Sequence, residues 1–331
     1  MKILLIRFSS LGDVVFTLPL AQALKGSGAE VAWAVEAPFA PLVEGAPFVD
    51  AVLPVRTRVW RHALFAERTR REVRGFLSAA RAFAPDVVVD AQGLWKSVWA
   101  AFLVPAARKV GFGPGTATER INCLATREWV DARDRPHAVD RGLALAERVT
   151  GRDGFGRLPD VAHLVRQRDE IVDGWLDRRG PHPFGLLQPW SSRPAKEWAP
   201  GSVTEVGRAL LDRGIEPVVK WGPSERERAT ALVAGSGGTL TMAPAAGVAA
   251  TARLASRAAL CIGTDSGPTH LAAAAAAPTL ALFGPTAPAR FGPVGPRVAA
   301  LTGRSADYNP WREGPLPNTD EILRATLPLL A

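Results

Sequence analysis

Short apolar runs alternate with alanine-rich stretches along almost the whole chain, and this alternation constrains the fold more than any other feature. The runs are rich in Val, Ile and Leu, as in KILLIR at 2–7 and DVVVD at 86–90, and their apolar residues occupy successive positions. A strand that is apolar on both faces must be covered on both faces, which is typical of parallel sheets flanked by helices. The sequence therefore predicts a doubly wound α/β fold.

The runs form two series, separated within residues 151–183 by a segment rich in Gly, Pro and charge. A length of 331 residues suits two domains of about 150 residues each. We expect strands at 2–7, 30–35, 51–55, 86–90 and 109–112 in the first series and at 184–188, 217–221, 258–262 and 279–283 in the second. We expect helices from about residue 13 and at 67–83, 93–103, 137–149 and 320–330.

The composition, 47% apolar and 22% charged, excludes a disordered chain and a membrane-embedded one. The apolar stretch after Lys2 is interrupted by Arg7 and Asp13, so it does not resemble a secretory signal. Cys123 and Cys261 are far apart in unrelated contexts, which argues against a disulfide scaffold or a zinc ribbon. A cytoplasmic location is expected.

The net charge of +8 suggests an anionic partner. Nucleic acid, an anionic membrane face and a phosphorylated or carboxylated substrate all satisfy the sign. Seven arginines lie within residues 56–74, and on charge alone a solvated helix face is the favoured explanation for them.

The motif RFSSLGDVVFTLP at 7–19 follows the first predicted strand. Ser9, Ser10 and Gly12 predict a tight turn where the backbone can approach a ligand, and Asp13 stands at the start of a helix. Asp13 is either a catalytic carboxylate or a carboxylate that stabilises the helix N-terminus. A dinucleotide-binding loop is disfavoured, because G-x-G-x-x-G is missing here.

The motif CIGTDSGPTHLAAAAAAP at 261–278 predicts a strand, a polar turn and a helix. Free amides and the dipole at a helix N-terminus form an anion site, although an ordinary turn with a packed histidine would also fit. The candidate residues of this loop are Asp265, Ser266, Gly267, Thr269 and His270.

Two further loops follow predicted strands of the second series. In LLQPWSSRPAKEW at 186–198, Lys196 beside Ser191 and Ser192 can neutralise a diphosphate, or it is an exposed lysine before a helix. In KWGPSERE, Glu225 can accept hydrogen bonds from ribose hydroxyls.

Three segments resemble the ADP-heptose:lipopolysaccharide heptosyltransferases, glycosyltransferase family 9: MKILLIRFSSLGDVVFTLP, DAQGLWKS at 90–97 and GTDSGPTHLAAAAAAPTLALFGPTAPARFGP. RVWRHALF and HAVDR at 137–141 are also similar. DAQGLWKS and the arginine stretch resemble most closely the members that add the first heptose.

The resemblance implies a GT-B fold, with two Rossmann-like parallel-sheet domains facing a central cleft. It implies an N-terminal acceptor-binding domain at 1–165, a C-terminal nucleotide-sugar domain at 176–315 and a helix at 316–331 that crosses back to the first domain. The implied reaction is inverting transfer of L-glycero-D-manno-heptose from ADP-heptose to Kdo of a lipid A precursor, by a monomer at the cytoplasmic face of the inner membrane.

The resemblance also implies residue roles. Asp13 matches the general base and Lys196 the group that stabilises the leaving diphosphate. The donor would contact Ser191, Ser192, Lys196, Glu225, Asp265, Ser266, Gly267, Thr269 and His270. The acceptor would contact Ser10, Gly12, Arg58, Arg61, His62, Lys96 and Arg120. No metal or other cofactor is expected.

The chain departs from the family pattern at Val59 and His62, where more basic residues are expected, and at Ser266 and Pro268 in the donor loop. The alternative is a related GT-B enzyme that uses another nucleotide sugar or a later core acceptor. A nucleic-acid-binding protein is disfavoured, because the arginines are not interleaved with aromatics and the strand-end motifs would be unexplained. The missing glycine fingerprint opposes a dehydrogenase.

Overall fold

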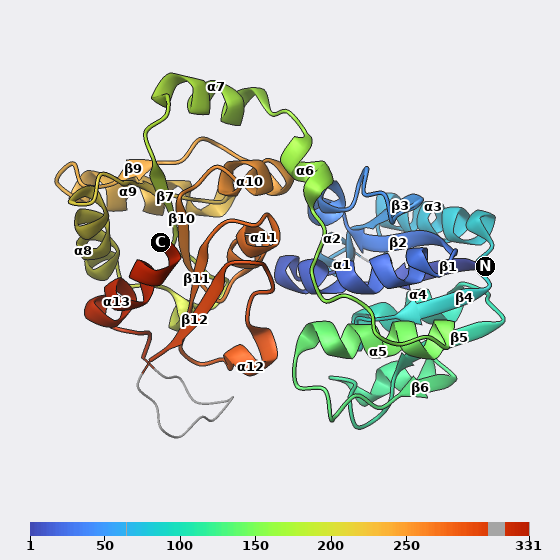
Figure 1. Cartoon of the computed structure of the whole chain (residues 1–331). Helices are drawn as coiled ribbons and strands as arrows, with labels where there is room; N and C mark the ends of the chain where they lie inside the picture. Colours follow the sequence, from blue (N-terminus) through green and yellow to red (C-terminus); the bar gives the residue numbers. More distant parts are fainter. Residues whose placement is uncertain (64, 304–314, 331) are drawn as a thin grey trace. The chain divides into compact units, whose positions relative to one another are not determined.

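The structure is a computed structural model that describes residues 1–63, 65–303 and 315–330, and the chain divides into two units, Met1–Asp160 and Val161–Ala331 (Figure 1). Leu64 in RVWRHALF, residues 304–314 of the predicted second domain and Ala331 lie outside the described residues. Each unit contains, within its described part, one six-stranded parallel sheet. The strand orders are β3-β2-β1-β4-β5-β6 and β9-β8-β7-β10-β11-β12, the same doubly wound topology twice. The predicted fold class is confirmed.

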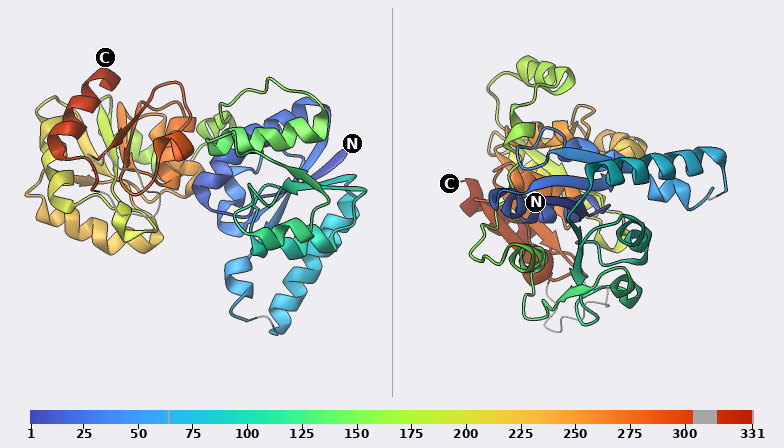
Figure 2. Two further views of the ribbon diagram at one scale, coloured as in Figure 1. Left: turned by 90° about the horizontal axis from the view of Figure 1, so that it is seen from below. Right: turned by 90° about the vertical axis from the view of Figure 1, so that its right-hand side faces the viewer.

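In the first unit the sheet has helices on both faces. Its elements are β1 Lys2–Ile6, α1 Leu11–Gly26, β2 Glu30–Glu36, η1 Ala37–Leu42, β3 Ala51–Val55, α2 Thr57–Trp60, α3 Glu67–Phe83, β4 Val87–Asp90, α4 Trp95–Leu103, β5 Arg108–Phe112, η2 Arg120–Leu124, β6 Glu128–Val130 and α5 Ala138–Thr150. Helices α3 and α4 cover one face, and α1 and α5 cover the other (Figure 2). Ile6 packs in one cluster with Phe76 of α3 and Ala100 of α4, while its buried neighbour Leu5 faces the other layer.

The second unit repeats this arrangement. Its elements are α6 Ala162–Arg166, α7 Glu170–Arg179, β7 Phe184–Gln188, η3 Pro194–Lys196, α8 Pro200–Leu211, β8 Glu216–Val219, η4 Pro223–Glu225, α9 Arg226–Gly235, β9 Thr241–Met242, α10 Val248–Ala255, β10 Leu260–Thr264, α11 Gly267–Ala274, β11 Thr279–Phe283, α12 Pro288–Phe291, β12 Val298–Thr302 and α13 Thr319–Leu330. Two buried clusters form its core. Leu187 and Ile262 lie in one of them, and Leu186 and Cys261 in the other, so successive residues of β7 and β10 fill opposite faces.

The structure divides the chain at a different residue from the predicted domain limits. The second unit begins at Val161, before the predicted boundaries of 165 and 176, because α6 packs against α10. Helix α13 buries Ile322 and Leu329 in the core of the second unit and packs on α8, β11 and β12. This helix therefore packs within the second unit, and the expected crossing to the first unit stays a prediction.

Three strands were missed by the sequence pattern: β6, β9 and β12. All three are edge strands of their sheets. β6 and β9 are only three and two residues long, and β12, VAALT, is apolar but partly exposed. The predicted strands β1, β4, β7, β10 and β11 lie inside their sheets and are largely buried, whereas β3, also predicted, is a partly exposed edge strand. Within the described residues, no helix combines the length and the apolarity needed to cross a membrane.

Candidate active site

Strands β1 and β4 are neighbours, with Ile6 paired to Asp90, so the loops that follow them meet at the carboxyl edge of the first sheet. Lys96, at the start of α4, donates from Nζ to Ser9 Oγ at 2.5 Å. Gln92 Oε1 accepts the backbone N–H of Ser9 at 3.2 Å. The motifs RFSSLGD and DAQGLWKS therefore form one cluster.

Asp13 is the carboxylate of this cluster and lies in the first turn of α1. Its Oδ2 accepts the N–H and the O–H of Ser10, both at 2.9 Å, which is the capping arrangement considered from the sequence. Its Oδ1 forms an ion pair with Arg7 Nη2 at 2.6 Å, and 32% of the side chain is exposed. Burial alone would raise the pKa of Asp13, but Arg7 and the Ser10 hydrogen bonds outweigh burial and hold the pKa below its ordinary value. The carboxylate is ionised at neutral pH and reachable by solvent.

Arg7 is a member of this cluster that sequence reasoning missed. It follows β1 directly, and its guanidinium also donates to the carbonyl oxygen of Ala91 after β4. A basic residue at the carboxyl end of a fully apolar strand was the available signal. Arg7 thus joins the two loops and sets the charge state of Asp13.

Lys96 is a predicted acceptor residue that the structure brings to the Asp13 loop, through its contact with Ser9. Burial and the neighbouring Arg7 charge lower the pKa of Lys96, while Asp13 and Glu36 partly offset this effect. Arg58 is exposed on α2, and its charge also lowers the pKa of Lys96, so Arg58 contributes to the electrostatic field at this edge of the sheet.

Of the other predicted acceptor residues, Arg61, His62 and Arg120 are exposed on the first unit, whereas Gly12 is not. Gly12 is buried in α1 beside Ser10. Arg61 and His62 are exposed after α2, and Arg61 Nε donates to His62 Nε2 at 3.0 Å. Arg120 is exposed at the start of η2. The acceptor role of these residues stays a prediction.

Asp90 explains why the loop after β4 holds its shape. It is fully buried and accepts hydrogen bonds from Asn122 Nδ2 at 2.7 Å and from the N–H of Gln92 at 2.8 Å. Burial raises the pKa of Asp90, which these hydrogen bonds partly offset. Asp90 fixes the turn that carries Gln92 and Lys96.

In the second unit, β7 and β10 are neighbours, with Gly263 paired to Gln188. Lys196 Nζ contacts Asp265 Oδ2 at 2.5 Å, across the loops that follow these strands. His270 Nε2 lies 3.0 Å from Asp265 Oδ1, and Thr286 Oγ1 donates to Oδ2 at 2.7 Å. The structure thus joins two separately predicted motifs, and Thr286 is a residue that the sequence analysis missed.

The charge of Asp265 is strongly stabilised. Burial would raise its pKa, but the hydrogen bond from His270 and the charge of Lys196 hold the pKa far below its ordinary value. Asp265 is therefore an anion at neutral pH, and it contacts both Lys196 and His270; its predicted part in donor binding stays a prediction.

The N-terminus of α11 lies beside this trio. Ser266 is the N-cap residue, and its Oγ lies 3.2 Å from Thr269 Oγ1. A Cβ at Gly263 would lie 2.3 Å from that Thr269 oxygen and 2.9 Å from Gln188 Cβ, so only glycine permits this close packing. The amides of the first turn, from Gly267 on, are placed as in an anion site.

The remaining donor candidates flank this region. Ser191 accepts the N–H of Arg193 at 3.3 Å, and Ser192 is exposed. Glu225 Oε2 accepts the N–H of Gly222 at 2.6 Å, which fixes the turn after β8. The donor roles of these side chains stay predictions.

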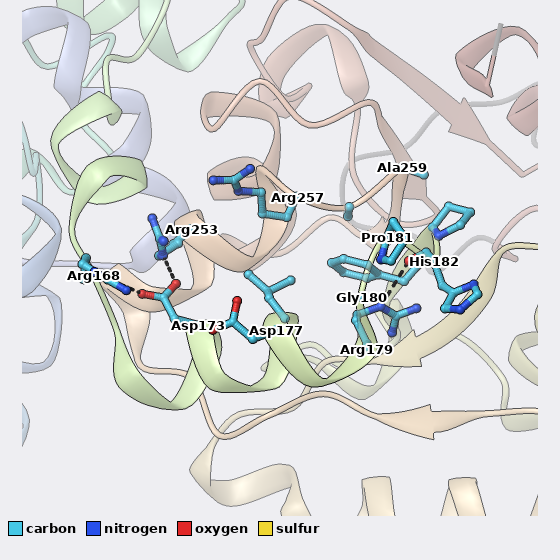
Figure 3. A pocket seen from close by; sticks show the side chains of 14 residues that line it. Arg168, Asp173, Asp177, Arg179, Gly180, Pro181, His182, Arg253, Arg257 and Ala259 are labelled. Carbon is cyan, nitrogen blue, oxygen red and sulfur yellow. Dashed lines mark hydrogen bonds and ion pairs between the residues drawn. The ribbon is translucent and has the colours of Figure 1, made fainter.

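A pocket of about 660 Å³ lies at the opposite, amino edge of the second sheet (Figure 3). It is lined by α7, the start of β7 and the residues before β10, and Asp173 in it forms ion pairs with Arg253 and Arg168. The predicted donor residues lie outside its lining. The carboxyl-edge clusters, and not this pocket, carry the candidate chemistry.

Comparison with known proteins supports the same interpretation. The family model of glycosyltransferase family 9 (heptosyltransferase) matches residues 75–313. Lipopolysaccharide heptosyltransferase 1 of Pseudomonas aeruginosa is 33% identical over 299 residues, which are 89% of this chain and 82% of the relative.

Two solved structures of the E. coli heptosyltransferase WaaC share the fold over 99% of this chain. The structure with ADP has a TM-score of 0.84 at 26% identity and is covered over 100% of its length. The structure with ADP-2-deoxy-2-fluoro heptose has a TM-score of 0.79 at 27% identity and is covered over 99%. The two repeated sheets are thus those of a GT-B glycosyltransferase, and the chain belongs to glycosyltransferase family 9, the heptosyltransferases.

Proposed function

We propose that the protein transfers L-glycero-D-manno-heptose from ADP-heptose to Kdo of a Kdo-lipid A acceptor in lipopolysaccharide inner-core synthesis. The relatives named lipopolysaccharide heptosyltransferase 1 and the likeness to WaaC bound to ADP and to an ADP-heptose analogue support this. The structural observation that carries the proposal is Asp13, an ionised and partly exposed carboxylate at the carboxyl edge of the first sheet.

Asp13 would act as the general base. An acceptor hydroxyl donates its proton to the carboxylate while its oxygen attacks the anomeric carbon of the donor, and ADP leaves from the opposite side with inversion. Because Arg7 lowers its pKa, Asp13 is a weak base in the ground state. Proton transfer is then most favourable late, when bond formation has made the hydroxyl acidic.

Lys196 and the first turn of α11 would neutralise the departing diphosphate. The Lys196 ammonium has three N–H donors and donates one of them to Asp265. This contact holds the ammonium in position and leaves its positive charge in place. Ser191, Ser192 and Thr269 would add hydroxyl donors, and Glu225 would bind the ribose. On this basis the reaction needs no metal ion, and treatment with a chelator should leave the rate unchanged.

The acceptor carries carboxylates and phosphates, which suits the basic residues of the first unit. Lys96 contacts Ser9, interacts with the charge of Asp13 and would orient the acceptor sugar, together with the exposed Arg58, Arg61, His62 and Arg120. The protein would work as a monomer at the anionic cytoplasmic face of the inner membrane.

The test is a transfer assay with purified protein, in which mass spectrometry measures the product. ADP-heptose with Kdo-lipid A should give addition of one heptose, and ADP-glucose or an acceptor that already carries the first heptose should react at least about tenfold more slowly. Faster transfer from another nucleotide sugar, or to the acceptor that already carries a heptose, would replace the proposed substrates with those of a related GT-B enzyme.

A further inference from the structure

The outer surface of α4, η2 and β6 carries large apolar side chains in contact with solvent. Among the described residues, six of the twelve exposed large apolar side chains lie within residues 95–129. Phe102 is 65% exposed and Leu124 is 78% exposed. Single exposed apolar residues are common, but such a concentration marks an interaction surface. We call it the α4–η2 surface; it consists of Trp95, Phe102, Leu103, Ile121, Leu124 and Trp129.

The elements that carry this surface are firmly joined. Asn122 Nδ2 donates to Leu94 O at 3.3 Å and to Ser97 Oγ at 3.1 Å, which ties η2 to the start of α4. The indole N–H of Trp129 is shared between Thr126 O at 3.1 Å and Cys123 O at 3.3 Å, so Trp129 of β6 is held against η2. The apolar side chains therefore project from a rigid base.

Basic residues border the α4–η2 surface. Lys109 Nζ donates to Phe102 O at 2.9 Å and lies 6.0 Å from the centre of that ring. Arg120 and Arg127 are exposed beside it. Within the described residues, none of these three cations forms an ion pair.

The two carboxylates in residues 95–129 are already engaged. Glu128 forms ion pairs with Arg108 and Arg148, and Glu119 accepts the backbone N–H of Trp95. Glu119 keeps its charge, but it is one anion beside the three cations Lys109, Arg120 and Arg127, so the border has an excess of positive charge.

We infer that the α4–η2 surface docks on an anionic lipid bilayer, with its apolar side chains in the interfacial layer and its cations at the headgroups. Aromatic and aliphatic side chains bordered by Lys and Arg are the combination that binds anionic membranes. A second copy of the chain is a poorer occupant, because it would bring the same basic border against itself.

The surface also connects to the candidate acceptor site, and this step rests on the proposed function. Helix α4 carries Lys96 at one end, in contact with Ser9, and Phe102 and Leu103 at the other. Docking through α4 would hold the Asp13 cluster at a fixed distance from the bilayer. A lipid-anchored acceptor could then be reached without being drawn out of the membrane.

The first test measures partition onto vesicles by sedimentation. The double variant Phe102→Ser, Leu124→Ser should bind phosphatidylglycerol-containing vesicles at least about tenfold more weakly than the wild type. The reason is that two apolar side chains that would insert into the bilayer interface are replaced by polar ones. The matched control is Leu158→Ser with Ile171→Ser, two side chains that are each 57% exposed and lie outside the surface. The control should bind as the wild type does.

Salt separates the apolar contribution from the electrostatic one. In about 0.5 M salt, where surface charges are screened, the wild type should retain more binding than the Phe102→Ser, Leu124→Ser variant. Equal partition of the variant, control and wild type would overturn the inference. Weak vesicle binding by all three, with a change of oligomeric state only in the surface variant, would instead identify a contact between copies.

A kinetic test keeps this inference apart from the proposed function. With acceptor embedded in vesicles, the surface variant should lose kcat/KM by a factor similar to its loss of binding, whereas acceptor freed of its acyl chains should be used as by the wild type. If the wild type fails to use either acceptor, the proposed function fails, and the vesicle measurement still decides the docking surface.

Discussion

Asp13 has two functions in one side chain, because it caps α1 through Ser10 and offers an ionised carboxylate to solvent. Replacement by Asn keeps the size and one acceptor oxygen for the cap but removes the base. Asp13→Asn should therefore lower kcat by about 10²–10⁴-fold, with ADP affinity changed little. Steady-state kinetics and ADP titration measure these two effects.

The control for this variant is Glu44→Gln, which replaces an exposed carboxylate of the same unit by an amide. It should retain full activity. Retention of kcat by Asp13→Asn, with normal thermal stability, would leave Asp13 as a helix cap alone.

Lys196 offers a second prediction at the scale of one residue. Lys196→Met keeps the length of the side chain and removes the charge assigned to the leaving diphosphate. The loss of a preorganised donor should lower kcat by about 10²-fold and weaken ADP binding as well. The neighbouring exposed Arg193→Met is the comparison. An equal effect of the two substitutions would mean that Lys196 contributes only general positive charge.

Lys220 gives a prediction about stability and pH. It is buried at the end of β8, donates to Trp221 O at 2.5 Å, and burial lowers its pKa from 10.5 to about 8, with Glu225 partly opposing the shift. Between these two pH values the unfolded chain holds a proton that the folded chain lacks. The free energy of unfolding should therefore fall by about 1.4 kcal/mol per pH unit as the pH is lowered from 10.5 towards 8, and this contribution should be constant below that range.

Urea unfolding at pH 8, 9 and 10 measures this slope in the wild type and in Lys220→Met. The difference between the two proteins should change across this range, since the variant lacks the titrating group. A parallel pH dependence would show that Lys220 is not held in a lowered-pKa state.

At the scale of elements, α2 and α3 carry arginines with different environments. Arg58 contributes to the field at Lys96, whereas Arg71 on α3 is already paired with Glu67 at 2.8 Å. Replacing Arg58 and Arg61 by Ala should raise the acceptor KM roughly tenfold or more and leave ADP binding unchanged, because charge-assisted hydrogen bonds to the acceptor are lost.

The corresponding change on α3 replaces Arg70, Arg71 and Arg74 by Ala. It should weaken attachment to anionic vesicles by up to about 1 kcal/mol per charge in a salt-sensitive way, with a smaller share from the paired Arg71. Acceptor kinetics and vesicle sedimentation at two salt concentrations distinguish the two sets. Indistinguishable variants would reduce both sets to solvated surface charge.

The elements also show what sequence could and could not predict. Strands such as β1 and β7 were predictable because burial on both faces requires a continuous apolar run. The short strand β9 carries no such run, and α13 presents an apolar stripe without indicating which unit receives it. The loops after strands were found because parallel topology places them at one edge.

The site was predicted through residues with distinctive chemistry in loops. Asp13, Lys196 and Asp265 stood out for that reason, and the structure joins the last two directly. Arg7 was missed because an arginine at a strand end has many ordinary explanations. Its meaning comes from tertiary contacts with Asp13 and with Ala91, which is remote in the chain.

At the scale of the whole molecule, the predicted donor residues all lie in the second unit, which has its own core. A fragment of residues 161–331 should therefore bind ADP by itself. At 100 times the dissociation constant, ADP should stabilise it by about 2.7 kcal/mol. Calorimetric unfolding with and without ADP measures this, and the Lys196→Met fragment should respond less. A fragment that folds but ignores ADP would place the donor contacts partly in the first unit.

The position of β1 has a consequence for synthesis on the ribosome. Strand β1 is made before both of its neighbours in the sheet, with β2 on one side and β4 on the other, and the backbone N–H of Lys2 is bound by the Asp86 carboxylate. Contacts between such distant segments close late, since loop closure must precede them. The nascent β1 segment therefore waits with one edge unpaired and its apolar side chains uncovered until the residues of β4 have emerged, and during that interval a chaperone that covers β1 would have its greatest effect on yield.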